Sequence, residues 1–229
     1  MTSANAATYR DAVAHLPPDG TLILNGVTWD EYESLAEHLG DHSPVRITYD
    51  QGRLEVMSPS TKHEKYSDMV TYMLRALAGK LGRPLESFGR ATFKQQWLDR
   101  GVEPDACFYV ENAASVATTE EIDLAKDPPP DIAVEIDISH GSTTKFGIYA
   151  GMRVPEVWRY DGRHAQMHIY HLAEQGYVEM TNSLAFPILT ADTLSEFLAQ
   201  SKAKGQTTAL ESFADWMRKS GIRKRSRTR

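Results

Sequence analysis

The chain has 229 residues, of which 41% are hydrophobic, and this composition is typical of a globular protein with a substantial core. Its apolar runs are shorter than the roughly 18 residues of a membrane span, so integral membrane proteins are excluded. The single cysteine, Cys107, excludes an internal disulfide. Because the N-terminal stretch also lacks the basic start and apolar segment of a secretory signal, we expect a cytoplasmic protein.

The net charge of −6 conceals a strong segregation of charge along the chain. Five of the 25 basic residues lie in the last nine positions, so residues 1–220 carry a net charge of −11. Residues 75–100 hold six basic and two acidic side chains, whereas residues 111–137 hold eight acidic side chains and one lysine. A metal-dependent phosphodiesterase could use the basic stretch to bind the phosphate backbone of a nucleic acid and the acidic stretch to bind a cation. A solvated charged surface is the simpler alternative.

The first half of the chain begins with clear helix and hairpin patterns. Residues 28–39 open with a capping-box spacing and predict a helix. Residues 45–50 and 53–57 alternate around a short turn and predict a hairpin. A longer helix is predicted from Thr61 to Leu81, because Thr61 and Glu64 repeat the capping-box spacing before an apolar stripe.

The rest of the chain predicts strands interspersed with helices. The predicted strands are 85–88, 91–98, 104–110, 131–137, 156–160, 166–172 and 177–180, and the predicted helices are 143–150, 191–200 and 208–219. This order indicates an α/β fold that borders on α+β, with a mixed central sheet flanked by helices. We divide it into an N-terminal extension (1–40), a core (41–200) and a C-terminal helix with a basic tail (201–229), all within one structural domain.

The most informative segment is PPPDIAVEID at 128–137. A strand there places Asp131, Glu135 and Asp137 on one face and three branched apolar residues on the other. Acidic groups repel one another when they are buried, and a bound divalent cation would offset that repulsion. The alternative is an edge strand whose acidic face meets water.

Two further residues extend this acidic strand into a candidate site. Asp105, in the strand at 104–110, would meet Glu135 if the two strands pair. Two carboxylates of this kind suit Mg²⁺ or Mn²⁺. Lys145 follows Glu135 by ten residues, in the first turns of the next predicted helix, although a solvent-exposed lysine is the ordinary alternative.

Four segments together resemble a known family: YDQGRLEVMSPSTKHEKY at 49–66, RGVEPDACFYV at 100–110, PPPDIAVEIDIS at 128–139 and KFGIYAGMRVPEVWRYDG at 145–162. They resemble the Uma-type family of restriction endonucleases, a branch of the PD-(D/E)XK nuclease superfamily. The resemblance implies a restriction-endonuclease-like core. It also implies that Asp105 and Glu135 bind the metal together with the backbone carbonyl of Ile136.

The chain departs from the superfamily pattern at one position. Asp137 stands two residues after Glu135, where the superfamily usually has its lysine. Either Lys145 supplies the ammonium group from the following helix, which we favour, or the site is impaired. Asp137 could then hold Lys145 or contact a second metal.

Other candidates have strong structural alternatives. Glu64 could orient the metal shell, as an acid on the first core helix does in many related nucleases, but we favour the capping box, which needs no catalysis. His63 alone is weak support for a ligand or base. Arg90 and Lys94 are candidate phosphate contacts, or ordinary exposed basic residues.

We therefore expect a Mg²⁺-dependent endonuclease that cleaves DNA, by resemblance leaving a 5′-phosphate, with Lys145 orienting water or neutralising charge. The variant Glu135→Ala is expected to abolish cleavage and leave the fold intact, because it relieves acidic repulsion. Two alternatives stay open: a noncatalytic protein that binds nucleic acid or assembles on a nuclease scaffold, and a metal hydrolase of small phosphoesters. A homodimer is also open, as is the choice between DNA and RNA.

Overall fold

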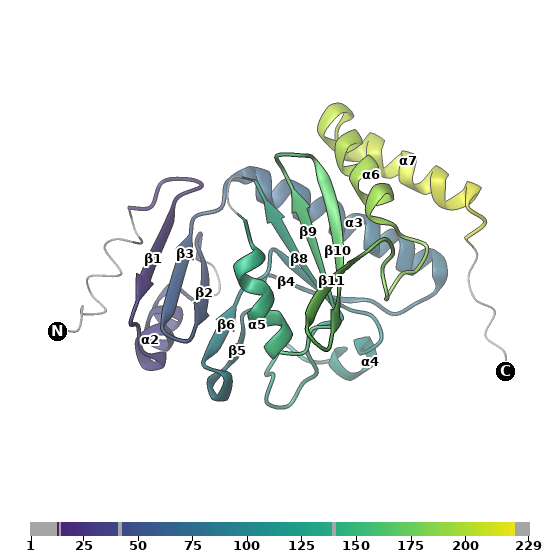
Figure 1. The fold of residues 1–229 in the computed structure, drawn as a ribbon. Coiled ribbons are helices and arrows are strands. Elements are labelled where there is room, and N and C mark those ends of the chain that lie inside the picture. Colours follow the sequence, from purple (N-terminus) through teal and green to yellow (C-terminus); the bar gives the residue numbers. More distant parts are fainter. Residues whose placement is uncertain (1–12, 14, 41–42, 139–140, 223–229) are drawn as a thin grey trace.

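The computed structural model describes residue 13 and residues 15–40, 43–138 and 141–222. The basic tail from residue 223 onward and Ser139 of the third family-like segment lie outside these described residues. Two sheets form the scaffold (Figure 1). The first sheet has five strands in the order β1-β3-β2-β6-β5, which are β1 Thr21–Asn25, β3 Arg53–Met57, β2 Arg46–Asp50, β6 Arg100–Val102 and β5 Phe93–Gln95.

The second sheet has six strands in the order β11-β10-β9-β8-β7-β4. They are β11 Gly176–Met180, β10 Gln166–Ala173, β9 Glu156–Asp161, β8 Ile132–Asp137, β7 Ala106–Tyr109 and β4 Glu86–Gly89. Strands β8 and β9 are parallel, whereas the other neighbours are antiparallel. The predicted mixed sheet is therefore confirmed.

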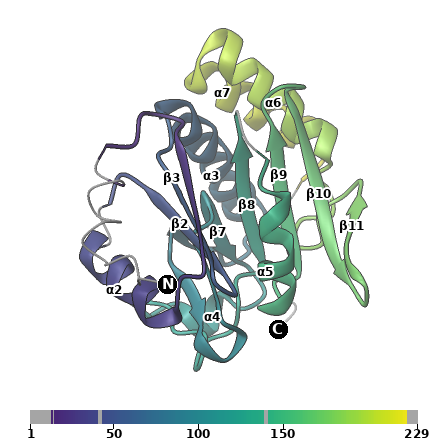
Figure 2. The same ribbon diagram turned by 60° about the vertical axis from the view of Figure 1, so that its left-hand side comes forward.

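Helices cover both faces of the second sheet (Figures 1 and 2). One face packs against α3 Thr61–Leu81, α6 Ala191–Lys204 and α7 Gln206–Lys219. The opposite face packs against α5 Phe146–Gly151, which follows the short 3₁₀ turn η2 Thr143–Lys145. The helix α2 Trp29–Leu39 packs with the first sheet around a separate apolar cluster. Among the described residues, no helix combines the length and the apolar character needed to span a bilayer.

Most predicted elements are present, and the differences have local causes. The strand predicted over 91–98 stops at β5 and turns into the 3₁₀ helix η1 Gln96–Leu98, where Asp99 adopts a positive φ. Three short elements were not predicted. β6 and α4 Ala113–Val116 have too few residues to show a period, and β1 has three consecutive apolar residues without alternation. The division of the strands into two separate sheets was also not predicted, since strand partners far apart in sequence are not visible in a local pattern.

The two predicted capping boxes have opposite outcomes, and the position of β8 decides the alternative for the acidic segment. The capping box that begins α2 is confirmed, with Thr28 and Glu31 bonded to each other's backbone N–H groups. The capping box at α3 is wrong: Ser60 is the N-cap, it makes no side-chain cap hydrogen bond, and Thr61 is already helical. The edge-strand alternative for the acidic segment is also wrong, because β8 lies between β7 and β9 and all of its residues are buried.

Close packing in the first sheet predicts that Gly101→Ala is destabilising. A Cβ atom at Gly101 would lie 2.5 Å from Cζ of Tyr32. Tyr32 cannot retreat easily, because it is buried and stacked on Tyr49 at 4.8 Å. We expect the free energy of unfolding to fall by about 1–3 kcal/mol, as for other overpacked cores.

The matched control is Gly79→Ala in α3, where the added Cβ meets no heavy atom within 4 Å. This control should raise the free energy of unfolding by roughly 0.5–1 kcal/mol, because alanine favours the helix. Urea unfolding of both variants measures the two effects. Equal stability of Gly101→Ala and wild type would contradict the packing argument.

Candidate active site

Asp105 is held rigidly beside β8 at the start of β7. Its backbone N–H donates to the Val134 carbonyl at 3.0 Å, and its Oδ2 accepts the Ile136 N–H at 2.7 Å. Ser67 on α3 donates its hydroxyl to the Asp105 carbonyl at 2.9 Å. Because β7 and β8 pair antiparallel, the expected approach of Asp105 to Glu135 follows from strand register.

Glu135 lies in the middle of β8 and is only 1% exposed. Lys145 Nζ, at the end of η2, contacts its Oε2 at 2.7 Å, and the Tyr149 hydroxyl on α5 donates to its Oε1. The structure therefore brings Asp105, Glu135 and Lys145 together from three segments. Tyr149 was not predicted, although its position four residues after Lys145 places both side chains on one side of a helical turn.

The two carboxyl groups have opposite pKa shifts. Burial raises the pKa of Glu135 to about 7, even though Lys145 and Tyr149 favour its ionised form. Burial also acts to raise the pKa of Asp105, but nearby His63, Lys145 and the Ile136 N–H together hold that pKa below its usual value. Burial acts to lower the pKa of Lys145, yet the negative charges of Glu135 and Asp105 raise it overall. Near neutral pH, Asp105 is thus ionised, Lys145 is charged and Glu135 exchanges a proton.

The other two acids of the strand each have protein partners of their own. Asp131 accepts the backbone N–H groups of Val110 and Asn112 at 2.7 and 3.1 Å. Asp137 accepts the Ser142 N–H at 3.0 Å and pairs with Arg159 rather than with Lys145. The repulsion predicted for this strand is therefore offset by separate partners for each acid.

Sequence patterns alone did not single out Arg46, a buried arginine on β2. Its side chain is 3% exposed, and its guanidinium group donates to Glu64 Oε1 at 2.9 Å. Its Nε lies 3.8 Å from Asp105 Oδ1. The sequence could have indicated Arg46, because it lies between Val45 and Ile47 in a predicted strand. A charged side chain that is buried in such a strand needs a partner.

Glu64 and His63 lie on either side of this arrangement. Glu64 also accepts from Arg90 at 3.2 Å and does not line the small cavity beside Asp105 and Glu135, so its link to the site runs through Arg46. His63 is buried, and its Nδ1 lies 3.8 Å from Asp105 Oδ2, which is too long for a hydrogen bond. Lys94 pairs with Glu33 of α2 at 3.1 Å and does not line the cavity.

A small cavity between the two sheets has side chains that suit a hard divalent cation. Asp105, Glu135 and Ile136 line it, together with Arg46, His63 and Lys145. Several buried polar atoms around it have no hydrogen-bond partner among the described residues: Asp19 Oδ1, Thr21 Oγ1, Arg46 Nε, His63 Nδ1 and Ser142 Oγ. In the described part of the chain, no three acidic, histidine or cysteine side chains are placed to hold a metal together. Two carboxylates, a carbonyl and water still fit Mg²⁺, which keeps several waters when it binds proteins.

Comparison with known proteins identifies the family of the chain. Residues 29–199 match the Uma2 family, which is described as "Putative restriction endonuclease". The chain belongs to the Uma2 family. The matched residues include Arg46, Asp105, Glu135 and Lys145. The resemblance seen in the sequence is therefore confirmed for this Uma2 protein.

A solved structure supports the fold of this Uma2 protein. It is described as "Crystal structure of a putative nuclease belonging to DUF820 from Anabaena variabilis ATCC 29413". It matches with a TM-score of 0.52 and 16% sequence identity, over 75% of this chain and 99% of that chain. The predicted restriction-endonuclease-like core is thereby confirmed. No curated protein matches this chain in sequence.

The buried Glu135–Lys145 pair changes the expected stability of Glu135→Ala. This variant leaves the Lys145 ammonium buried without its main partner, so we expect a loss of about 3–5 kcal/mol in the free energy of unfolding. Glu135→Gln keeps the side-chain size and should lose less. The double variant Glu135→Ala/Lys145→Met should recover part of the loss. Urea unfolding tests this order, and a fully stable Glu135→Ala would favour the repulsion argument made from sequence.

The raised pKa of Glu135 predicts a pH dependence of stability in the metal-free protein. The folded protein holds this proton up to about pH 7, whereas the ordinary pKa of the group is 4.5. Stability from this group is therefore full below pH 4.5 and lost as pH rises towards 7.

Relative to Glu135→Gln, wild type should lose a few kcal/mol of unfolding free energy across that window, since one pKa unit corresponds to about 1.4 kcal/mol. Urea unfolding at a series of pH values measures the difference between the two proteins. Parallel pH profiles would show that Glu135 titrates normally.

Proposed function

We propose that the protein is a metal-dependent endonuclease that hydrolyses phosphodiester bonds in DNA. The observation that carries this proposal is the contact of Lys145 with Glu135 at 2.7 Å, beside Asp105 on the same face of the sheet. Two carboxylates and an ammonium group are the side chains that metal-assisted phosphodiester hydrolysis requires. Membership of a family described as "Putative restriction endonuclease" supports the same reading.

Asp105, Glu135 and the carbonyl of Ile136 would hold Mg²⁺ or Mn²⁺. When bound, such an ion would polarise the phosphate and make hydroxide available near neutral pH. Asp105 is suited to this role because its pKa stays below the usual value. Glu135 must lose its proton first, so we expect affinity for the ion to rise with pH through about 7.

Lys145 would act on the substrate. Its ammonium group, fixed by Glu135, lies at the catalytic cavity and can neutralise negative charge that develops on the phosphate oxygens. It can also orient the attacking water. The water would lose a proton to solvent, and its oxygen would bond to phosphorus while the bond to the 3′ oxygen breaks. The 3′ oxygen would take up a proton, which leaves a 3′-hydroxyl on one product and a 5′-phosphate on the other.

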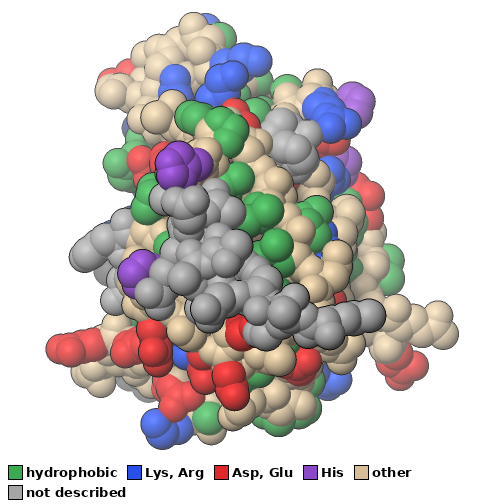
Figure 3. Space-filling view, turned by 90° about the vertical axis from the view of Figure 1, so that its left-hand side faces the viewer, with side chains coloured by type: hydrophobic (Ala, Val, Ile, Leu, Met, Phe, Trp, Pro, Cys, Tyr) green, Lys and Arg blue, Asp and Glu red, His purple; other side chains and the backbone are tan. Residues whose placement is uncertain are grey.

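The charge on the protein surface limits the sides from which DNA could approach. On the face formed by β1 and α2, the visible described side chains include a group of acidic residues along the lower part (Figure 3). Asp30 and Glu31 lie in the first turn of α2 and give that end of the helix a negative charge. A polyanion is repelled by such a surface, so we propose that DNA approaches the catalytic cavity from another side.

A cytoplasmic location and a homodimer belong to the same proposal. Cys107 is a free, buried thiol, which suits a reducing compartment. Two copies would supply one catalytic site for each DNA strand. Size-exclusion chromatography with light scattering would test the dimer.

The proposal predicts metal-dependent cleavage that needs both Glu135 and Lys145. Supercoiled and linear DNA should be cut with Mg²⁺ or Mn²⁺ and remain intact with EDTA. Glu135→Gln and Lys145→Met should each lower the cleavage rate by at least about a hundredfold, the usual range for losing such a group. The matched control is Lys126→Met, an exposed lysine paired with Asp123, which should cleave as wild type does.

The outcomes separate the competing functions. DNA binding without cleavage by folded wild type would favour the noncatalytic protein. Turnover of small phosphoesters with intact DNA would favour the small-substrate hydrolase. Cleavage that survives Lys145→Met would show that the lysine has a structural role.

A further inference from the structure

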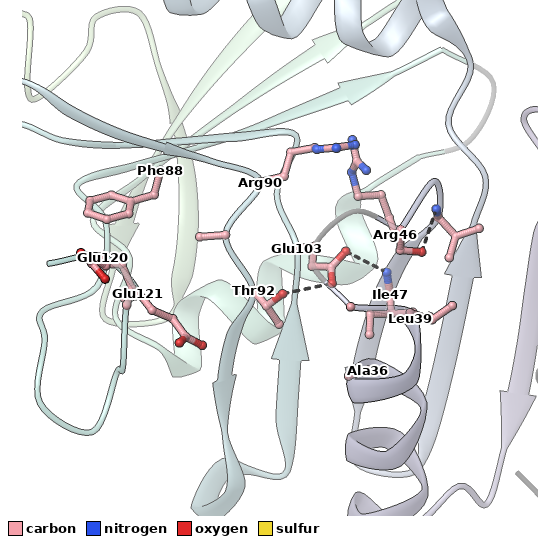
Figure 4. A pocket seen from close by; sticks show the side chains of 15 residues that line it. Ala36, Leu39, Arg46, Ile47, Phe88, Arg90, Thr92, Glu103, Glu120 and Glu121 are labelled. Atoms are coloured by element: carbon pink, nitrogen blue, oxygen red, sulfur yellow. Dashed lines mark hydrogen bonds between the residues drawn. The ribbon is translucent and has the colours of Figure 1, made fainter.

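A second, larger pocket adjoins the catalytic cavity. It has a volume of about 560 Å³ and lies between the C-terminal part of α2, the start of β2, residues 88–92 and residues 120–122 (Figure 4). Ligand sites for small molecules usually span about 300–1,000 Å³. The pocket is therefore large enough for one nucleotide.

Arg46 joins the two spaces, because it lines both of them. Its side chain is buried, and its Nε has no hydrogen-bond partner among the described residues. Glu64 holds the other end of the same guanidinium group and also binds Arg90. Figure 4 shows the Arg46 and Arg90 side chains coming together at one end of the pocket. Guanidinium groups in such an arrangement are suited to phosphate.

The rest of the pocket is suited to a nucleobase. Phe88 forms part of one wall and is supported by Tyr109, edge to face, at 5.5 Å. The Glu103 carboxylate accepts the Ile47 N–H at 3.3 Å and the Thr92 hydroxyl at 3.1 Å, one on each oxygen. Each oxygen keeps a lone pair for a further donor, such as the exocyclic amine of a base.

The charges at the two ends of the pocket would also orient a bound nucleotide. Glu120 and Glu121 are exposed and lie on the Phe88 side in Figure 4, away from both guanidinium groups. A phosphate is repelled from that end and attracted to the other. A bound nucleotide would therefore place its phosphate next to the catalytic cavity and its base next to Phe88.

We propose that this pocket is a nucleotide subsite, which holds one nucleotide of a DNA strand while Arg46 contacts the phosphate that leads into the catalytic cavity. The proposal rests on the nuclease function for its substrate class. It requires that the nucleotide be unstacked from its neighbours, as in single-stranded or frayed DNA.

The first test fills the pocket. Ala36 on α2 lines it, so Ala36→Trp should block the base without changing charge. The neighbouring Glu37 is exposed and does not line the pocket, which makes Glu37→Trp the matched control. The probe is a short fluorescein-labelled single-stranded oligodeoxynucleotide in EDTA, followed by fluorescence anisotropy. We expect Ala36→Trp to raise its Kd about tenfold and Glu37→Trp to leave Kd near the wild-type value.

The second test removes a charge at the phosphate end and carries little risk to folding. Arg90 is exposed, so Arg90→Ala should fold normally and weaken binding of the same oligonucleotide. The slope of log Kd against log salt should fall by about 0.7, the value for one phosphate contact on a single strand. Lys202→Ala, at an exposed position near the end of α6, should leave the slope unchanged. Ala36→Trp should also leave the slope unchanged.

These results separate the subsite from the nuclease. If wild type does not cleave DNA but Ala36→Trp and Arg90→Ala weaken binding as described, the nuclease fails and the subsite stands. If wild type cleaves DNA and folded Ala36→Trp binds as tightly as Glu37→Trp, the subsite fails and the nuclease stands. Equal salt slopes for Arg90→Ala and Lys202→Ala would also overturn the subsite.

Discussion

The buried ion pair between Glu135 and Lys145 is the constraint on which the candidate site depends. Removing two charges from water is costly, and the mutual attraction of the pair offsets that cost only when geometry and hydrogen bonds are good. Here the contact is 2.7 Å, and Tyr149 satisfies the second carboxylate oxygen. The pair also links the central strand β8 to the turn that precedes α5.

The chain topology makes this pair possible. Strands β8 and β9 are parallel, so the chain must cross back over the sheet between them. The crossover is short and consists of η2, α5 and their flanking residues, and Lys145 lies where it first meets the sheet. The lysine is thus delivered to the same sheet face as Asp105 and Glu135, although the usual position two residues after the glutamate holds Asp137.

The first sheet completes the site from the other side. Arg46 extends from β2 towards Asp105 and is fixed by Glu64 on α3, so two sheets and a helix meet at one charged cluster. Three acids of this region each pair with a different basic residue: Glu135 with Lys145, Glu64 with Arg46, and Asp137 with Arg159. The surroundings of Asp105 and Glu135 explain why their pKa values shift in opposite directions: burial dominates at Glu135, whereas at Asp105 it is outweighed by His63, Lys145 and the Ile136 N–H.

The sequence by itself determined the local elements and the order of the main site residues. The capping box at Thr28, the hairpin before Thr61 and the alternation in β8 are short-range patterns, and they predicted their elements correctly. The tertiary structure alone decided that Glu64 binds Arg46 instead of capping its own helix, that Asp131 accepts backbone N–H groups of the loop after β7, and that the first sheet brings Arg46 to Asp105. These contacts join residues 18 to 59 positions apart, and a local pattern records the periodicity of a segment but not the partner on which it packs.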